Sequence, residues 1–95
     1  MTPFSGKTLM ITGGTGSFGE AVLKRFLDTD IAEIRIFSRD EKKQDDMRHH
    51  YQNDKIKYYI GDVRELSSVK NAIHGVDYLF HAAALKQVPS CEFFP

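Results

Sequence analysis

The sequence predicts an α/β fold in which a parallel β-sheet is covered by helices on both faces. Short apolar runs alternate with longer stretches in which apolar residues recur every three or four positions, as they do in amphipathic helices. A glycine-rich segment, 13–19, lies directly between the first apolar run and the first helical stretch. Alternation of this kind is typical of parallel strands joined by right-handed helical crossovers.

The first strand and the first helix have the clearest patterns. Thr8–Thr12 is a short apolar run that reads as a buried strand. The helix expected over Ser17–Asp28 repeats Phe18, Val22 and Phe26 at intervals of four, so these side chains share one face. That face is the one expected to pack on the sheet.

The second strand is expected at Glu33–Phe37 and the second helix at Asp40–Asn53. This helix is very polar, and only Met47 and Tyr51, four residues apart, indicate a narrow contact stripe. Ser38 and Glu41 have the spacing of a capping box, which predicts that Ser38 caps the helix.

The remaining elements complete the alternation. A third strand is expected at Lys57–Ile60, a third helix from Leu66 to a stop at Gly75, and a fourth strand at Asp77–His81. The expected strand order is 3-2-1-4, half of a Rossmann-type doubly wound sheet. Residues 1–95 are therefore expected to be the N-terminal portion of a dinucleotide-binding domain, without a substrate domain. In such an incomplete sheet the fourth strand is expected to be an open edge, so the isolated piece is expected to be marginally stable, to dimerise or to swap segments.

The glycine segment carries the strongest functional signal. Gly13 permits a tight turn off the strand, Gly16 permits close approach of a pyrophosphate, and Gly19 lets helix and strand pack closely. The following helix offers free N–H groups to phosphate oxygens. The alternative is a glycine turn that binds no ligand. A Walker-type phosphate loop is excluded, because no Gly-Lys-Ser/Thr follows.

The end of the second strand favours NADP over NAD. Sheets that bind NAD carry an Asp or Glu there, which bonds the ribose hydroxyls. Here Ser38 and Arg39 occupy that place, with Lys42 and Lys43 one helical turn further on. A hydroxyl and a guanidinium suit a 2′-phosphate. The alternatives are that the lysines form a solvated face and that Ser38 is only a helix cap.

Two further segments lie after strands. Asp62 and Val63 follow the third strand, where an adenine would lie, and Ala82, Ala83 and Ala84 follow the fourth, near the nicotinamide half. Alternatively, Asp62 caps the third helix and the alanines pack against the next helix.

Composition excludes several other functions. Thirteen basic residues balance thirteen acidic ones, so no nucleic-acid partner is expected. No apolar stretch is long enough for membrane insertion, and a single cysteine suits a reducing compartment, with cytoplasmic localisation expected. No metal site is expected, because the adjacent His49 and His50 diverge on a helix.

Four segments together resemble a known family: Thr12–Gly19, Ser38–Gln44, Gly61–Arg64 and His81–Pro89. They resemble the extended short-chain dehydrogenase/reductase superfamily. More narrowly, they resemble bacterial UDP-N-acetylglucosamine 4,6-dehydratases of the polysaccharide biosynthesis family, which serve capsule, flagellin-glycan or O-antigen synthesis and are related to UDP-glucose 4-epimerases. The resemblance covers about Lys7 to Pro95, the opening part of a family member.

The resemblance implies a set of site residues. They would be Gly13, Thr15, Gly16, Ser17, Phe18 and Gly19 at the pyrophosphate, Ser38, Arg39 and Lys42 at the 2′-phosphate, Asp62 and Val63 at the adenine, and Ala82, Ala83 and Ala84 at the nicotinamide ribose. Lys86 would face the substrate. No catalytic residue is expected among these residues, since the family's Tyr-x-x-x-Lys pair comes after two further strands.

The resemblance also implies a reaction on a UDP-sugar by a homo-oligomeric enzyme. Hydride passes from sugar C4 to NADP⁺, water leaves across C5 and C6, and hydride returns to C6. The chain alone is predicted to be inactive. Two alternatives remain open: a UDP-sugar 4-epimerase of the same superfamily, and a non-catalytic NADP-binding module.

Overall fold

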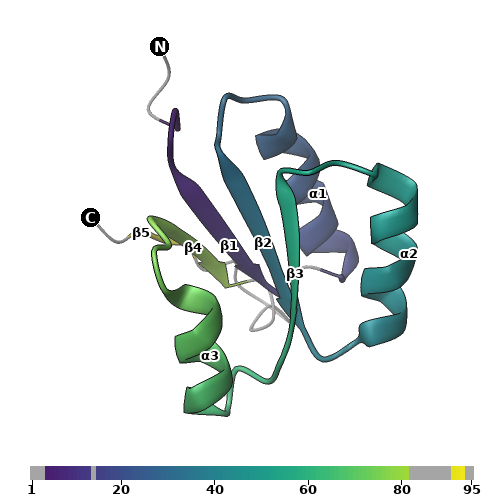
Figure 1. Cartoon of the computed structure of the whole chain (residues 1–95), viewed down its shortest axis with the longest axis vertical. Helices are drawn as coiled ribbons and strands as arrows, with labels where there is room; N and C mark the ends of the chain where they lie inside the picture. Colours follow the sequence, from purple (N-terminus) through teal and green to yellow (C-terminus); the bar gives the residue numbers. More distant parts are fainter. Residues whose placement is uncertain (1–3, 14, 82–90, 94–95) are drawn as a thin grey trace.

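The computed structural model describes residues 4–13, 15–81 and 91–93, and its strands form one sheet in the order β3-β2-β1-β4-β5 (Figure 1). The strands are β1 (Thr8–Thr12), β2 (Glu33–Ser38), β3 (Ile56–Ile60), β4 (Tyr78–His81) and β5 (Cys91–Phe93). All pairs of neighbouring strands among β1 to β4 are parallel. The predicted Rossmann-type order 3-2-1-4 is confirmed.

Three helices connect the parallel strands. They are α1 (Ser17–Leu27), α2 (Glu41–Tyr51) and α3 (Leu66–Ile73). Helices α1 and α2 lie on one face of the sheet and α3 lies on the other (Figure 1). The expected elements are confirmed, with ends displaced by at most two residues. Gly75 has the positive φ of 82° expected of a glycine just beyond a helix end.

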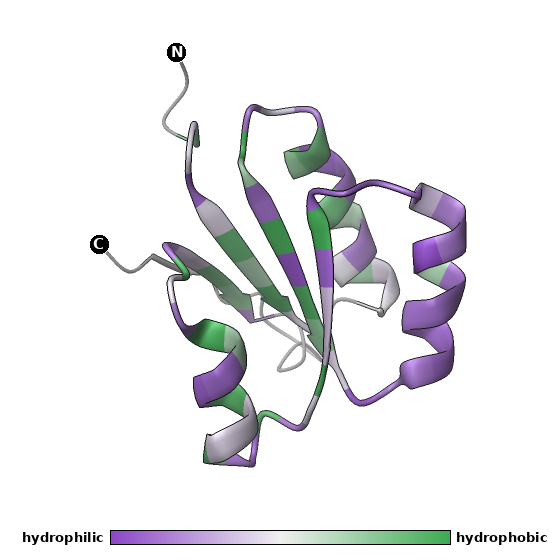
Figure 2. Ribbon diagram, in the orientation of Figure 1, coloured by the Kyte–Doolittle hydropathy of each residue, from purple (hydrophilic) through white to green (hydrophobic). Residues whose placement is uncertain are grey.

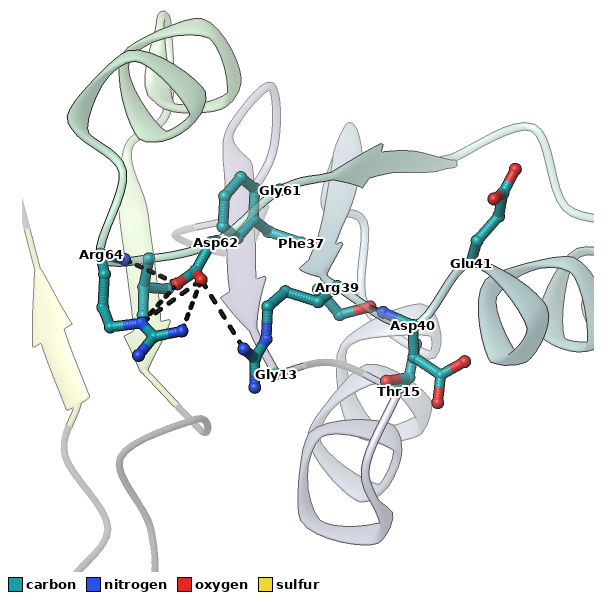
Figure 3. Close-up of a pocket in the computed structure, with 11 residues that line it drawn as sticks. Gly13, Thr15, Phe37, Arg39, Asp40, Glu41, Gly61, Asp62 and Arg64 are labelled. Carbon is teal, nitrogen blue, oxygen red and sulfur yellow. Dashed lines mark hydrogen bonds and ion pairs between the residues drawn. The ribbon is translucent and has the colours of Figure 1, made fainter.

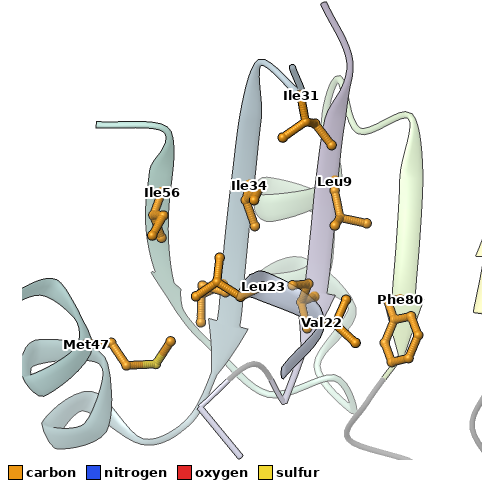
Figure 4. Packing of buried hydrophobic residues seen from close by; sticks show 10 residues of the cluster. Leu9, Val22, Leu23, Ile31, Ile34, Met47, Ile56 and Phe80 are labelled. Atoms are coloured by element: carbon orange, nitrogen blue, oxygen red, sulfur yellow. The ribbon is translucent and has the colours of Figure 1, made fainter. Parts of the chain in front are cut away.

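The core has two layers because side chains alternate along the strands. Leu9 and Ile11 of β1 face α1, where they join Val22 and Leu23 in the larger cluster (Figure 4). Met10 points to the opposite face, into the smaller cluster beside α3. Hydropathy follows the same plan, with apolar residues on the central strands and an almost wholly polar α2 (Figure 2). Both faces of the central strands are therefore buried, as a parallel sheet requires.

The polar helix α2 is held by the narrow stripe expected from the sequence. Met47 is buried in the larger cluster, and Tyr51 packs against it. The Tyr51 hydroxyl donates a hydrogen bond to Glu20 of α1 over 2.7 Å. Burial, together with this contact to the Glu20 carboxylate, raises the pKa of Tyr51 above its usual value. Tyr51 therefore has a structural role between two helices.

The expectation of an open edge at the fourth strand is wrong. Strand β5 pairs with β4 in an antiparallel register, with Phe80 opposite Cys91. Between His81 and Cys91 the chain has fewer residues than a crossover to a parallel strand needs, so a returning strand can pair only in the antiparallel sense. The outer edge of β4 is therefore occupied by β5.

The prediction that Ser38 caps α2 is also wrong. The N-cap is Asp40, whose side chain accepts a hydrogen bond from the backbone N–H of Lys43 over 3.0 Å. Ser38 is still the last residue of β2 and lies too early in the chain to cap the helix. Its hydroxyl is therefore left for other contacts.

Parallel pairing brings the carboxyl ends of β1, β2, β3 and β4 to one edge of the sheet. Thr12 of β1 is opposite Phe37 of β2 and His81 of β4. The Thr12 hydroxyl lies 2.5 Å from Nδ1 of His81, so this histidine joins the ends of two neighbouring strands. In the part of the chain described, no helix is long and apolar enough to cross a bilayer.

Candidate functional site

A cavity of about 690 Å³ opens at the carboxyl ends of β1, β2 and β3 (Figure 3). Its walls come from the glycine segment after β1, the connection between β2 and α2, and the loop between β3 and α3. It brings together six residues predicted from the sequence, namely Gly13, Thr15, Ser38, Arg39, Asp62 and Val63. Its volume lies in the range of small-molecule sites, and its position is where ligands bind in doubly wound sheets.

Gly13 and Thr15 of the glycine segment line the site where β1 meets α1. Gly13 has a φ of 68°, a conformation that favours glycine, and its N–H donates to the Phe37 carbonyl over 2.7 Å. Gly16 is the N-cap of α1, and no side chain caps the first turn. A helix that begins without a side-chain cap leaves backbone N–H donors available to an anion.

The β2 end contributes one hydroxyl and one guanidinium. Ser38 is buried, and its Oγ accepts hydrogen bonds from the backbone N–H of Asp40 over 3.3 Å and from Gln44 over 3.0 Å. Arg39, in contrast to the buried Ser38, has 70% of its side chain exposed. The cavity therefore has a fixed polar group beside an exposed cation.

Asp62 is clamped by Arg64 two residues further along the chain. Its carboxylate accepts from the Arg64 backbone N–H over 2.9 Å and from the Arg64 guanidinium over 2.9 to 3.3 Å. These hydrogen bonds, with a smaller contribution from the charge of Arg39, lower the pKa of Asp62 to about 2. The alternative role as helix cap is wrong, because Glu65 is the N-cap of α3.

The two arginines hold Asp62 unequally. Arg39 lies 3.7 Å from the carboxylate, whereas Arg64 makes several short hydrogen bonds to it (Figure 3). Arg64 therefore neutralises Asp62 locally and leaves Arg39 with a long, exposed ion pair that is worth little. An incoming anion can take Arg39 without leaving Asp62 unpaired. The residues present thus fit a phosphorylated ligand.

We expect the contribution of Asp62 to stability to disappear only in strong acid. The pKa of Asp62 is about 2 in the folded chain, against 3.8 for an unperturbed aspartate, so the stabilisation is present above about pH 4 and is lost as the pH falls through 2. Urea unfolding of the wild type and of Asp62→Asn at pH 7, 4 and 2 measures this. The wild type should be the more stable chain at pH 7 and 4, and the difference should narrow at pH 2. A difference that has already vanished at pH 4 contradicts the clamp.

Not every predicted residue reaches this cavity. Lys42 lines a separate cavity beside α2 together with Arg48. Gly16, Ser17, Phe18 and Gly19 are not among the lining residues: Gly19 is a buried residue of α1, and the Phe18 ring packs edge-on against Phe80 with centroids 5.4 Å apart. Ala82, Ala83, Ala84 and Lys86 lie outside the described residues.

Five further residues line the cavity that were not predicted as site residues. Phe37, Gly61 and Arg64 line the cavity, as do Asp40 and Glu41. The Gly61 backbone N–H donates to the Ser38 carbonyl over 2.9 Å, which joins the ends of β2 and β3. A glycine directly after a strand was the signal that could have identified Gly61. Arg64 gave no such signal, because an exposed arginine after a turn is common.

Comparison with known proteins identifies relatives over nearly the whole chain. A family model described as polysaccharide biosynthesis protein matches residues 9–95. A curated relative from Rickettsia canadensis, named UDP-glucose 4-epimerase, is 70% identical over 96 residues, which cover 97% of this chain and 28% of that protein. The chain thus spans somewhat more than a quarter of the length of the curated relatives it matches.

Solved structures share the fold. The structure titled Pen from Bacillus thuringiensis is 37% identical, with a TM-score of 0.84, and the match covers 92% of this chain and 27% of that one. A short-chain dehydrogenase/reductase from Saccharomyces cerevisiae is 25% identical, with a TM-score of 0.70, over 86% of this chain and 35% of that one. The resemblance to the short-chain dehydrogenase/reductase superfamily and to the polysaccharide biosynthesis family is therefore confirmed.

Proposed function

The chain belongs to the polysaccharide biosynthesis protein family, and we propose that it binds the adenosine half of NADP within an enzyme that modifies a UDP-sugar. The single observation that carries this proposal is the cavity in which Ser38 and Arg39 meet the glycine segment and Asp62. A hydroxyl and an exposed guanidinium converge there, and the uncapped start of α1 follows directly after the lining residues Gly13 and Thr15. Phosphate oxygens are the groups that such donors bind.

Each part of the cavity suits one part of the ligand. The backbone of the glycine segment would hold the pyrophosphate, and Ser38 and Arg39 would hold the 2′-phosphate. Val63, whose exposed fraction is 38%, offers an apolar surface to the adenine ring. Asp62 would accept a hydrogen bond from the adenine amino group, because Arg64 holds its carboxylate ionised.

The acidic residues of the cavity do not oppose this assignment. Asp40 is engaged at the start of α2, where its side chain accepts from the Lys43 N–H. The Glu41 side chain points away from Arg39 (Figure 3). The negative charge of the Asp62 carboxylate is balanced by the Arg64 guanidinium. Arg39, whose contact with Asp62 is a long one of 3.7 Å, is the exposed cation at the end of β2, and this favours NADP over NAD.

The reaction proposed for the whole protein begins with oxidation of the sugar at C4. A bound nicotinamide supplies the hydride acceptor, and the residues described here hold and orient the nucleotide. Loss of water across C5 and C6, followed by return of the hydride to C6, would make the protein a UDP-N-acetylglucosamine 4,6-dehydratase, a lyase. Return of hydride to C4 from the other face would make it a 4-epimerase. The names of relatives that are 70% identical favour the epimerase. NMR of the products formed from UDP-glucose and UDP-N-acetylglucosamine by the whole protein separates the two.

We expect Arg39→Ala to weaken NADP⁺ binding roughly 10- to 100-fold, since a hydrogen bond to a charged group contributes about 1.5–3 kcal/mol. NAD⁺ binding should change little, because NAD⁺ lacks the 2′-phosphate. Isothermal titration of the chain with both cofactors measures the two effects.

Lys42→Ala is the matched control, because Lys42 is exposed and lines a different cavity. It should cost NADP⁺ affinity less than Arg39→Ala does. Equal losses from both substitutions would mean that diffuse positive charge binds the phosphate. A wild-type chain that binds NADP⁺ and NAD⁺ equally would contradict the assignment of the 2′-phosphate site.

A further inference from the structure

Gln44 of α2 is a fully buried polar side chain next to the cavity, with only 1% of its surface exposed. It does not line the cavity, yet it contacts Ser38, which does. We infer that Gln44 is a positioning residue that makes Ser38 a pure hydrogen-bond donor, and so tunes the site toward a phosphate rather than a ribose hydroxyl. This role rests on the proposed function.

The orientation of the Gln44 amide is determined by its neighbours. Its Nε2 lies 2.9 Å from the Tyr59 carbonyl oxygen of β3 and 3.4 Å from the Ser38 carbonyl oxygen. Carbonyl oxygens can only accept hydrogen bonds, so the amide nitrogen must face them. The opposite orientation would set Oε1 against two acceptors. The group that Gln44 presents to Ser38 is therefore a donor.

The Ser38 hydroxyl is consequently restricted. Its Oγ accepts from Gln44 Nε2 over 3.0 Å and from the Asp40 backbone N–H over 3.3 Å. A hydroxyl has two acceptor lone pairs and one donor hydrogen, so only the hydrogen remains free. Phosphate oxygens accept and do not donate, whereas a ribose hydroxyl does both. A serine that can only donate matches the phosphate better.

The other end of the Gln44 amide offsets part of the stability that Nε2 provides through its hydrogen bond to the Tyr59 carbonyl. In the part of the chain described, Oε1 is buried and has no hydrogen-bond partner. A buried acceptor without a partner is destabilising, and an aliphatic side chain of similar length would avoid that effect. The Ser38 carbonyl, moreover, already accepts from the Gly61 N–H. The contact that only Gln44 provides to the site is the one to the Ser38 hydroxyl.

The test is a double-mutant cycle of Gln44→Met and Ser38→Ala, read as dissociation constants for NADP⁺ and NAD⁺. Gln44→Met should weaken NADP⁺ binding about 2- to 10-fold, the range of one neutral hydrogen bond, and leave NAD⁺ within about 2-fold. In the Ser38→Ala background it should not change the NADP⁺/NAD⁺ ratio further. Gln52→Met, the same substitution at the exposed end of α2, is the control.

Two outcomes overturn the inference. One is an equal loss for both cofactors, which indicates a structural role. The other is a change of the ratio that persists without the Ser38 hydroxyl. If the wild type binds neither cofactor, the proposed function fails as well; if Arg39→Ala selectively weakens NADP⁺ and Gln44→Met does not, only the inference fails.

A measurement on the wild type covers the case in which Gln44→Met does not fold. In the ¹⁵N-labelled chain, the Gln44 side-chain N–H₂ signals should exchange slowly with water. They should shift more on addition of NADP⁺ than of NAD⁺, because a hydrogen bond donated by Ser38 strengthens the one it accepts. Equal shifts with both cofactors overturn the inference.

Discussion

Gly16→Ala is expected to abolish NADP⁺ binding while leaving the fold intact. Gly16 has a φ of −79° and a ψ of 168°, which any residue adopts. A Cβ added there would meet only the Gly13 carbonyl oxygen, at 3.5 Å, an ordinary contact. Nothing in the described part of the chain therefore requires a glycine at this position. A phosphate lying against the backbone would require one, because the Cβ would take its place.

The expected loss of NADP⁺ affinity is at least about 100-fold, the result of overlap with a tightly packed ligand. The free energy of unfolding should change by less than about 1 kcal/mol, since alanine caps a helix less well than glycine but also restricts the unfolded chain. Isothermal titration and thermal melting measure the two effects separately.

Gly75→Ala is the control with the opposite expectation. Gly75 has a φ of 82° and lies at the end of α3, so alanine there should lower stability and leave the NADP⁺ dissociation constant unchanged. If Gly16→Ala binds NADP⁺ as the wild type does, the glycine segment is only a turn, and the alternative left open by the sequence is correct.

The residues whose meeting at one cavity follows from the sequence are those placed by strand order. Gly13, Ser38 and Asp62 each lie at or just beyond the end of a strand, and parallel pairing brings such ends together whatever the side chains do. Local alternation was therefore enough to predict their meeting. The same argument could not predict β5, because its pairing depends on where a returning segment meets β4.

The placements that the sequence did not predict depend on helix orientation and on side-chain contacts. Lys42 is close to Arg39 in sequence, but α2 begins at Glu41 and directs it toward a different cavity. Gln44 contacts Ser38 from six positions away, a spacing that no single element predicts. Arg64 matters only because its guanidinium turns back onto Asp62. Such contacts follow from packing, which a one-dimensional pattern does not record.

Gly61→Ala is expected to destabilise the fold strongly. Unlike Gly16, Gly61 has no room for a Cβ within the protein itself. A Cβ on Gly61 would lie 2.7 and 2.8 Å from two ring atoms of Phe37 and 2.9 Å from the Cβ of Ser68. Phe37 is only 1% exposed, so its ring has no space to move into. Ser68 belongs to α3, so the helix itself would have to shift. Overpacking of a core in this way costs about 1–3 kcal/mol, and two rigid neighbours place Gly61 at the upper end.

Thermal melting should show a fall of roughly 10–20 °C, because each kcal/mol shifts the midpoint by about 4–8 °C in a domain of this size. Phe37→Leu in the same chain removes the ring atoms in question, so the double variant should lose less stability than the two single losses added together. Additive losses would mean that Ser68 and α3, not Phe37, set the limit. Since Gly61 also joins the ends of β2 and β3 beneath the cavity, its loss should weaken cofactor binding through the fold, whereas the loss at Gly16 acts on the ligand alone.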